Sequence, residues 1–426
     1  MADALRITAP PNLPSLVRTA FSRAAANGDL TYYQTQVAIL TPGSIPPFQL
    51  RFSPSLASKP KNTKPQQPKD KPAAPFNPFA DPDPALLIAR LPQPATHTLV
   101  LNKFAIVPGH FILITNDFKP QTHLLEADDL EAAYACIRAY REDAAQRKAT
   151  VTSGGGNGGG GEEEERGSDL FVFFNSGPFS GASQPHRHLQ LLPIQNMKVG
   201  LPPSSAPTSM TASSSSSSDP QGPAGSDEWT PLIDSLHPDS AQEEESATTI
   251  SRRRRCPFEI FSTPITPQMS AQERHAAYIQ LYRRACAAVQ AFKSPPQQTQ
   301  KLPPPPPPPR QAESPAESLA AAGEEAQISY NLAMTSSVLA LCPRLAEGSV
   351  IYDDARGGTG DGSGDRPIIG KIELNGTVLA GTALVKSQAE WDAVRKNPGL
   401  LLSVLEKIGI PTQDARPIPT TRELSL

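Results

Sequence analysis

The sequence has little of several features that would assign a protein to a class at once. It contains only four cysteines in 426 residues, with no Cys-x-x-Cys pair, so neither a zinc ribbon nor a disulfide framework is indicated. It has no run of eighteen apolar residues and no apolar N-terminal segment, so we expect neither a membrane span nor secretion. The 39 basic and 42 acidic side chains nearly cancel, so no overall field favours nucleic acid or a membrane surface. Together these absences favour a cytoplasmic protein.

Proline, in contrast, is abundant: its 48 residues are about twice the average usage. The prolines gather with glycine, serine and charged residues in stretches that lack the apolar side chains needed to offset the entropy of ordering. We interpret these stretches as disordered insertions or linkers: residues 59–72, 152–168, 202–228, 239–255 and 294–326.

The chain between these insertions predicts an α+β fold. Strands lie beside helices without regular βαβ alternation, which favours a mainly antiparallel sheet with packed helices. We divide the chain into an N-terminal catalytic region (1–200), a disordered linker (201–255) and a C-terminal region (256–426). Apolar or β-branched runs predict strands at residues 98–107, 111–115, 170–175, 186–192, 328–334 and 338–341.

Helices are predicted where apolar residues recur at helical spacing behind a capping residue. One begins near Asp128, and the pairs Ser270/Glu273 and Ser387/Glu390 each precede another. Residues 400–408 form the last. Asn375-Gly376, between two short apolar runs, is the strongest hairpin signal in the chain.

The most informative stretch is Gly181-Ala-Ser-Gln-Pro-His-Arg-His-Leu-Gln190. If this segment is extended, the alternate spacing puts His186, His188 and Gln190 on one face of a sheet. Asn175 closes the preceding strand, and the Gly/Ser-rich turn that follows it can direct backbone N–H groups and hydroxyls at phosphate oxygens.

Three interpretations compete for this alternation. It is compatible with a solvated strand face, or with a metal-binding His-x-His pair, although no third and fourth ligands stand nearby. It is also compatible with nucleotidyl transfer, because a neutral imidazole attacks phosphorus well near neutral pH. The turn directly before the histidines favours this third interpretation.

Residues 175–193 (NSGPFSGASQPHRHLQLLP) resemble the signature of the fungal-type diadenosine tetraphosphate phosphorylases, also called ATP adenylyltransferases. That family belongs to the histidine-triad superfamily, on the branch of the galactose-1-phosphate uridylyltransferases. Four further segments resemble the family in the same order: Phe52–Pro60, Leu101–His110, Tyr330–Thr335 and Gly381–Ser387. The resemblance therefore implies a histidine-triad-like fold interrupted by the insertions.

The resemblance also implies a reaction. His188 matches the nucleophile, which would take AMP from diadenosine tetraphosphate and pass it reversibly to inorganic phosphate, giving ATP and ADP. His186 would orient the nucleophile or a phosphate oxygen, with packing support as the alternative. Gln190 would hold a non-bridging oxygen. A divalent cation such as Mg²⁺ would pair with the polyphosphate, but no protein ligand set for a metal is visible and no organic cofactor is implied.

Substrate contacts are implied for a wider set of residues. Some of them have plainer explanations, because isolated lysines are usually solvated and Asn331 and Thr335 also suit a strand end and a turn. The set is Lys59, Asn102, Lys103, Asn175, Gly181, Ala182, Ser183, Gln184, Gln190, Asn331 and Thr335. The chain departs from the family at Ser336-Ser337, where a larger or basic residue is usual, and at Gly109.

Two alternatives to this function stay open. One is another nucleotidyltransferase, such as a hexose-1-phosphate uridylyltransferase. The other is an interaction protein, because Pro303–Pro309 is typical of the polyproline segments that SH3 or WW modules bind. Arg252–Arg255 would suit an acidic partner or a nuclear address, which makes the nucleus a second expected location. The partners we expect are nucleotides and inorganic phosphate, with neither nucleic acid nor membrane.

Overall fold

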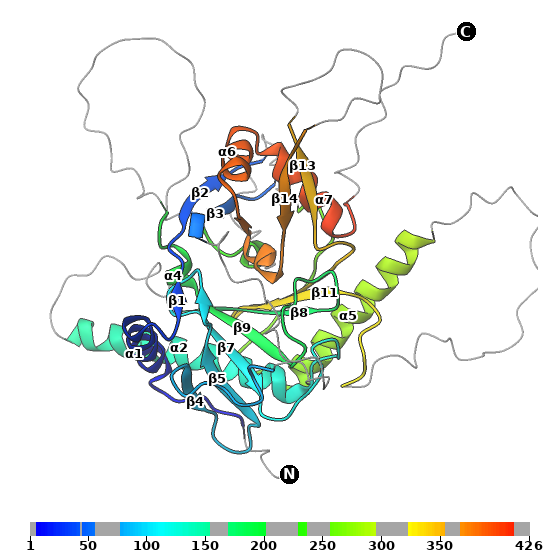
Figure 1. Ribbon diagram of the computed structural model, residues 1–426. Helices are drawn as coiled ribbons and strands as arrows, with labels where there is room; N and C mark the ends of the chain where they lie inside the picture. The colour runs from blue at the N-terminus through cyan, green and yellow to red at the C-terminus, as the bar shows by residue number, and fades with distance from the viewer. Residues whose placement is uncertain are drawn as a thin grey trace, which may run out of the picture.

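The main sheet has eight strands, all antiparallel, and it separates two hydrophobic cores, one on each of its faces (Figure 1). The computed structural model describes residues 6–42, 45–55, 77–153, 169–201, 229–236, 256–294, 323–353 and 367–412. In spatial order the strands are β10 (Phe261–Pro264), β12 (Val338–Pro343), β11 (Tyr330–Met334), β8 (Leu170–Ser176), β9 (His188–Pro193), β7 (Phe111–Thr115), β5 (His97–Leu101) and β4 (Leu87–Arg90). The predicted α+β class with a mainly antiparallel sheet is confirmed.

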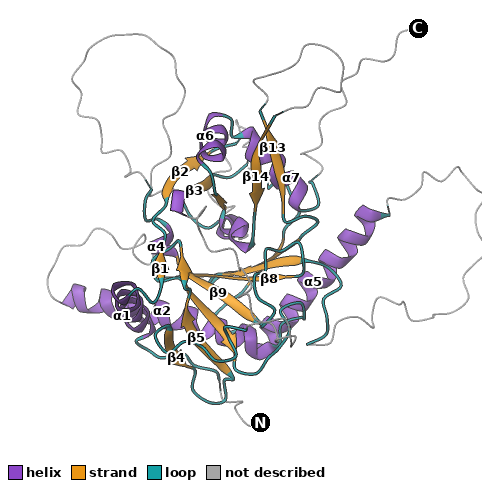
Figure 2. Cartoon of the chain, viewed as in Figure 1, coloured by secondary structure: helices purple, strands orange, loops and turns teal. Residues whose placement is uncertain are grey.

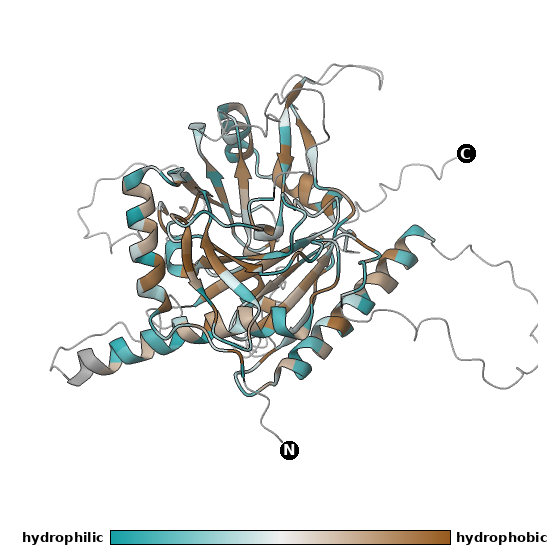
Figure 3. Ribbon diagram, turned by 60° about the horizontal axis from the view of Figure 1, so that its bottom comes forward, coloured by the Kyte–Doolittle hydropathy of each residue, from teal (hydrophilic) through white to brown (hydrophobic). Residues whose placement is uncertain are grey.

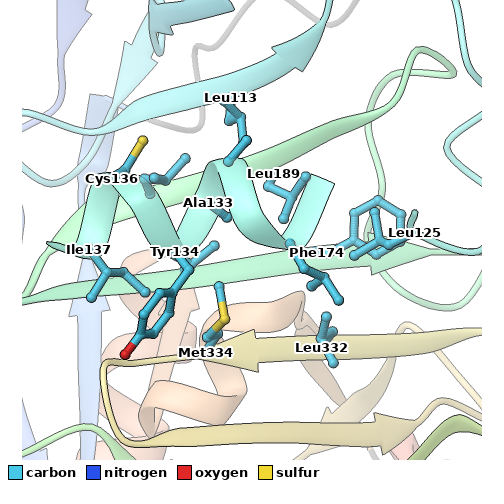
Figure 4. Packing of buried hydrophobic residues seen from close by; sticks show 14 of the residues in the cluster. Leu113, Leu125, Ala133, Tyr134, Cys136, Ile137, Phe174, Leu189, Leu332 and Met334 are labelled. Atoms are coloured by element: carbon cyan, nitrogen blue, oxygen red, sulfur yellow. The ribbon is translucent and has the colours of Figure 1, made fainter. Parts of the chain in front are cut away.

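Three helices cover one face of this sheet (Figure 2). They are α1 (Leu13–Asn27), α2 (Ala127–Ser153) and α5 (Ala271–Lys293). Alternate strand residues such as Phe174, Leu189 and Leu332 point into the core beneath α2, as Figure 4 shows. Because side chains alternate along a strand, the residues between them must point to the opposite face.

The opposite face carries a second core, which includes Phe171, Phe173 and Ala333. The hydropathy colours of Figure 3 show apolar strands inside and helices that carry both polar and apolar residues. The elements that pack on this face are β2 (Gln36–Leu40), β3 (Phe48–Phe52), α4 (Ile194–Met197), η3 (Leu232–Leu236), β13 (Gly348–Tyr352), β14 (Ile368–Glu373), η6 (Gly376–Ala380), β15 (Thr382–Val385), α6 (Gln388–Lys396) and α7 (Gly399–Ile408). The short strands β1 (Thr31–Tyr32) and β6 (Phe104–Ala105) form a separate parallel pair.

The predicted helix starts are confirmed in detail. Ser270 and Ser387 both close complete capping boxes, with Glu273 and Glu390 as the reciprocal partners. Within the described residues, no helix is long and apolar enough to cross a membrane, and all four cysteines are free thiols.

The predicted insertions fall almost entirely outside the described residues. The exceptions are short: α2 runs on to Ser153, and Ser294 and residues 323–326 border the insertion between α5 and β11. Lys59, Arg252–Arg255 and Pro303–Pro309 lie outside the described residues, so the contact of the proline run with an SH3 or WW module stays a prediction.

The hairpin predicted at Asn375-Gly376 is wrong. Residues 376–380 form the 3₁₀ helix η6, and β14 pairs with β13 instead. The side chain of Asn375 caps η6 by accepting a hydrogen bond from the N–H of Thr377 at 3.0 Å. The N–H of Gly376 donates to Oδ1 of Asn175 at 2.9 Å. A contact with a distant strand therefore decides this turn, and local residue preference does not.

Gly376→Ala should destabilise the protein. An added Cβ would lie 2.5 Å from Cδ2 of Phe173 and 2.8 Å from Oδ1 of Asn175, and overpacking of this kind costs about 1–3 kcal/mol. Chemical denaturation measures the effect. Gly399→Ala is the matched control, because its nearest neighbour is the flexible end of Asn397 at 3.0 Å. Equal stability of the two variants would contradict this account of η6.

Candidate functional site

His188 and Gln190 lie on the sheet face that points away from α2 and α5. Their neighbours Leu189 and Leu191 belong to the helix-side core. In the ladder His188 stands opposite Ile114, and Gln190 stands opposite Ile112 and Phe173. The alternation predicted from the sequence is therefore present in the strand, and it places two polar groups on one face.

His188 is held as a neutral imidazole with one nitrogen available. Its Nδ1 lies 2.8 Å from the carbonyl oxygen of His186. Because a carbonyl only accepts, Nδ1 carries the proton and Nε2 keeps its lone pair. Nε2 has no hydrogen-bond partner among the described residues. The residue is 2 % exposed, and this burial lowers the pKa of His188 to about 4, against the opposing effect of the His186 carbonyl.

His186 supports this arrangement from just before the strand, where it forms an isolated bridge with Pro120. Its Nε2–H donates to the carbonyl of Thr115 at 2.8 Å, and its Nδ1 accepts from Nδ2 of Asn77 at 3.0 Å. Burial lowers the pKa of His186, although the hydrogen bonds to Thr115 and Asp117 oppose the shift. Both ring nitrogens are engaged by the protein, so His186 acts on His188 through its backbone carbonyl.

Gln190 is oriented by His110, a residue to which the sequence analysis gave no role. Nε2 of His110 donates to Oε1 of Gln190 at 2.6 Å. Nδ2 of Asn102 lies 3.2 Å from Nδ1 of His110, and Oδ1 of Asn102 accepts from the N–H of Phe104 at 2.9 Å. These hydrogen bonds engage the amide oxygen of Gln190, which leaves its NH₂ group as the donor that can bind a ligand.

Gln121 is a second residue that the sequence analysis missed. The β8–β9 ladder stops at Phe173 and Gln190, and beyond that point the Gln121 side chain joins the two strands. Its Oε1 accepts from the N–H of His188 at 2.8 Å, and its Nε2 donates to the carbonyls of Asn175 at 2.8 Å and His188 at 3.2 Å. An isolated glutamine in a connecting segment gives no sequence signal for this role.

Asn175 and Asn331 are directly paired in the register of β8 and β11. Nδ2 of Asn331 donates to Oδ1 of Asn175 at 2.8 Å and to the carbonyl of Ser180 at 2.9 Å. Oδ1 of Asn331 accepts from the buried guanidinium of Arg344. The amide of Asn331 thus fixes Asn175 and the turn that follows it.

The segment that follows Asn175, residues 176–184, has features that suit an anion-binding loop. Gly177 and Gly181 adopt φ values of +87° and +79°, which side chains disfavour. At Gly181 a Cβ would also lie 2.7 Å from Cβ of Asn375. None of the N–H groups of residues 181–184 has an acceptor within the described parts of the chain. Ala182 and Ser183 are exposed, so these donors are open to a bound phosphate.

The other predicted contacts are placed differently. Lys103 is exposed, next to Asn102. Thr335 is buried beyond the far end of β11, and its hydroxyl donates to Oδ1 of Asp234 at 2.8 Å. The structure therefore gathers His186, His188, Gln190, Asn175 and the turn into one site, but it does not bring Thr335 to it.

On the helix side, Arg187 ties the histidine segment to the start of α2. Its Nη1 donates to Oδ2 of Asp129 at 2.8 Å and to Oε1 of Glu126 at 3.0 Å, and His97 hydrogen-bonds Oδ1 of Asp129. Burial alone raises the pKa of Asp129, but the bond from His97 and the charge of Arg187 outweigh it and hold that pKa below its usual value. The buried pair is thus ionised, and it anchors the strand from beneath.

We predict that His188 stays neutral well below the pH at which an ordinary histidine titrates. Its pKa of about 4 contrasts with about 6.5 for a free imidazole. NMR titration of the ¹⁵N-labelled protein without substrate would measure it, and His188→Gln would assign the signal by its loss. A midpoint near pH 6.5 would contradict the buried, neutral state.

Two family models match the chain. The family model "Ap4A phosphorylase N-terminal domain" matches residues 4–144 and 166–206. The model "ATP adenylyltransferase C-terminal domain" matches residues 254–411. Together the two models cover most of the chain on both sides of the linker.

Two relatives from Saccharomyces cerevisiae resemble part of the chain. Diadenosine 5',5'''-P1,P4-tetraphosphate phosphorylase 2 is 32% identical over 183 residues, which is 42% of this chain and 50% of that protein. Protein APA1 is 29% identical over 189 residues, 43% of this chain and 50% of that protein. The chain therefore spans about half the length of the curated relatives it matches.

Solved structures share the fold over a longer span. The crystal structure of yeast Ap4A phosphorylase Apa2 superposes with a TM-score of 0.58 and 21% identity, covering 94% of this chain and 98% of that one. The same yeast protein in complex with Ap4A gives 0.58 and 20%, with the same coverage.

Proposed function

The chain belongs to the Ap4A phosphorylase and ATP adenylyltransferase family, and on that premise we propose that it splits diadenosine tetraphosphate (Ap4A) with inorganic phosphate into ATP and ADP. The observation that carries the proposal is the state of His188. It is a neutral imidazole with Nε2 available, and it directly follows the β8–β9 turn whose N–H groups are open. Such a pair of features suits nucleophilic attack on a phosphate that the turn holds in place.

The reaction proceeds in two displacements at one phosphorus. Nε2 of His188 attacks the α-phosphorus of Ap4A, the bond from that phosphorus to the bridging oxygen breaks, and ATP leaves. An oxygen of inorganic phosphate then attacks the same phosphorus, the P–N bond breaks, and its electron pair returns to Nε2 as ADP leaves. The second step run backwards is the same kind of displacement as the first, with ADP in place of Ap4A. The transfer can therefore run in either direction.

Other residues hold the phosphate that reacts. The NH₂ group of Gln190, oriented by His110, donates to a non-bridging oxygen, and the N–H groups of Gly181–Gln184 bind the others. Lys59 and Lys103 offset polyphosphate charge. Asn331 acts through Asn175, whose position its amide fixes. We give Thr335 no contact with the reacting phosphate, because its hydroxyl donates to Asp234.

A divalent cation such as Mg²⁺ would accompany the polyphosphate as part of the substrate. Within the described residues, no three His, Cys, Asp or Glu side chains cluster so as to hold a metal ion. We propose that the phosphate oxygens of the substrate hold the cation.

Incubation with Ap4A, with and without inorganic phosphate, tests the proposal. Separation of the nucleotides should show ATP and ADP in equal amounts, and only when phosphate is present. AMP with ATP in the absence of phosphate would indicate a hydrolase. Turnover of a nucleoside diphosphate sugar with a hexose 1-phosphate, and none of Ap4A, would indicate a uridylyltransferase.

His188→Asn should abolish turnover, because the carboxamide has no nucleophilic nitrogen. His123→Asn is the matched control, since His123 lies in the segment before α2 and contacts Thr122 and Glu325. Full activity of His188→Asn would overturn the assignment of the nucleophile.

His110→Phe should slow the reaction although His110 touches no reacting atom. Without its donor the amide of Gln190 can rotate, and misplacement of a phosphate contact costs roughly tenfold to a hundredfold in rate. We expect kcat to fall more than KM rises, because the contact matters most in the transition state. Steady-state rates against Ap4A concentration measure both. Unchanged kinetics would show that Gln190 is positioned without His110.

A further inference from the structure

The short segment Asn77-Pro78-Phe79-Ala80 lies over the histidine pair, and neither the sequence patterns nor the proposed reaction gives it a role. Oδ1 of Asn77 accepts from the N–H of Phe79 at 3.0 Å, which folds the segment into a tight turn. Nδ2 of Asn77 lies 3.0 Å from Nδ1 of His186. The turn is therefore anchored on His186.

The Phe79 ring packs against the imidazole of His188, the proposed nucleophile. Its centroid lies 5.1 Å from that of His188 and 6.0 Å from that of His186. The ring also packs on the small apolar cluster of Val100, Ile112 and Ile114. Ile114 stands directly opposite His188 in the β7–β9 ladder. On this side, the imidazole of His188 therefore faces apolar side chains.

Water exclusion at this point has a chemical consequence. An AMP group on imidazole is reactive toward any oxygen nucleophile, and water is far more concentrated than phosphate. Gln190 does not titrate near neutral pH, so it cannot activate water as an imidazole would. That property slows hydrolysis but does not keep water away, whereas an apolar ring over the adduct does.

We propose that Phe79 is a positioning residue that selects the acceptor, because its ring excludes water from the AMP adduct of His188. This inference rests on the proposed nucleotidyl transfer. With the ring in place, a phosphate oxygen bonds to the adduct phosphorus, the P–N bond breaks, and ADP leaves. Without it, a water oxygen bonds to the same phosphorus, the P–N bond breaks, one proton passes to solvent, and AMP leaves.

Phe79→Ala tests the inference through the ratio of AMP to ADP formed from Ap4A at a fixed phosphate concentration. We expect the ratio to rise about tenfold, because the substitution opens the adduct to solvent. Phe79→Leu should restore most of the wild-type ratio, since it keeps an apolar side chain. Phe292→Ala is the matched control, because that phenylalanine is 43% exposed near the end of α5.

A second readout does not depend on product partition. Phe79→Ala should move the acid limb of kcat/KM upward by about one pH unit toward the ordinary imidazole value, since burial is what depresses it. A packing role alone would change thermal stability and leave this limb in place. Should Phe79→Ala melt below the assay temperature, a Phe79→Met and Phe79→Leu series carries the test, with the ratio rising as apolar cover is lost.

The outcomes separate the two proposals. Absence of phosphate-dependent ADP from the wild-type protein would refute the proposed function. Normal phosphorolysis by the wild type, with the same AMP to ADP ratio and the same acid limb in Phe79→Ala as in Phe292→Ala, would refute the role of Phe79 alone.

Discussion

The site depends on one hydrogen bond, from Nδ1–H of His188 to the carbonyl of His186. It selects the tautomer, and so decides which ring nitrogen keeps the lone pair that can attack phosphorus. Several neighbouring residues hold that carbonyl and that ring in place. The imidazole of His186 is bound at both nitrogens, Gln121 takes over where the β8–β9 ladder ends, and Arg187 fixes the segment from the helix side. A neutral, buried imidazole is stable here because no charge needs to be solvated.

The two faces of the main sheet have different roles, and successive residues of β9 alternate between them. Along β9, Leu189 and Leu191 enter the core under α2, while His188 and Gln190 face the other way. The strand is held by apolar burial on one side, which leaves its other side free to carry polar groups at fixed spacing. Gln190 has a second support in His110, so both functional side chains of β9 are held by hydrogen bonds from neighbouring elements.

The strand face that carries the histidines and the helix starts were predictable from local sequence patterns. The contacts that were not predicted join residues far apart in the sequence. Period-two alternation gave the histidine face, and capping boxes gave the starts of α5 and α6. Gln121 and His110 carry no periodicity, and they meet their partners from 67 and 80 positions away. The turn at Gly376 depends on Asn175, 201 residues earlier. Sequence patterns describe neighbours along the chain, whereas these contacts arise only when the sheet is assembled.

The order of strands in the main sheet shows that the two matched regions share one sheet. Strands β4, β5, β7, β8 and β9 come from the N-terminal matched region and β10, β11 and β12 from the C-terminal one, and the two sets join along β8 and β11. Expressing either region alone would leave the edge of β8 or of β11 unpaired, and unpaired apolar strand edges are prone to self-association. The two regions that match separate family models are thus halves of one sheet, and neither contains a complete sheet without the other.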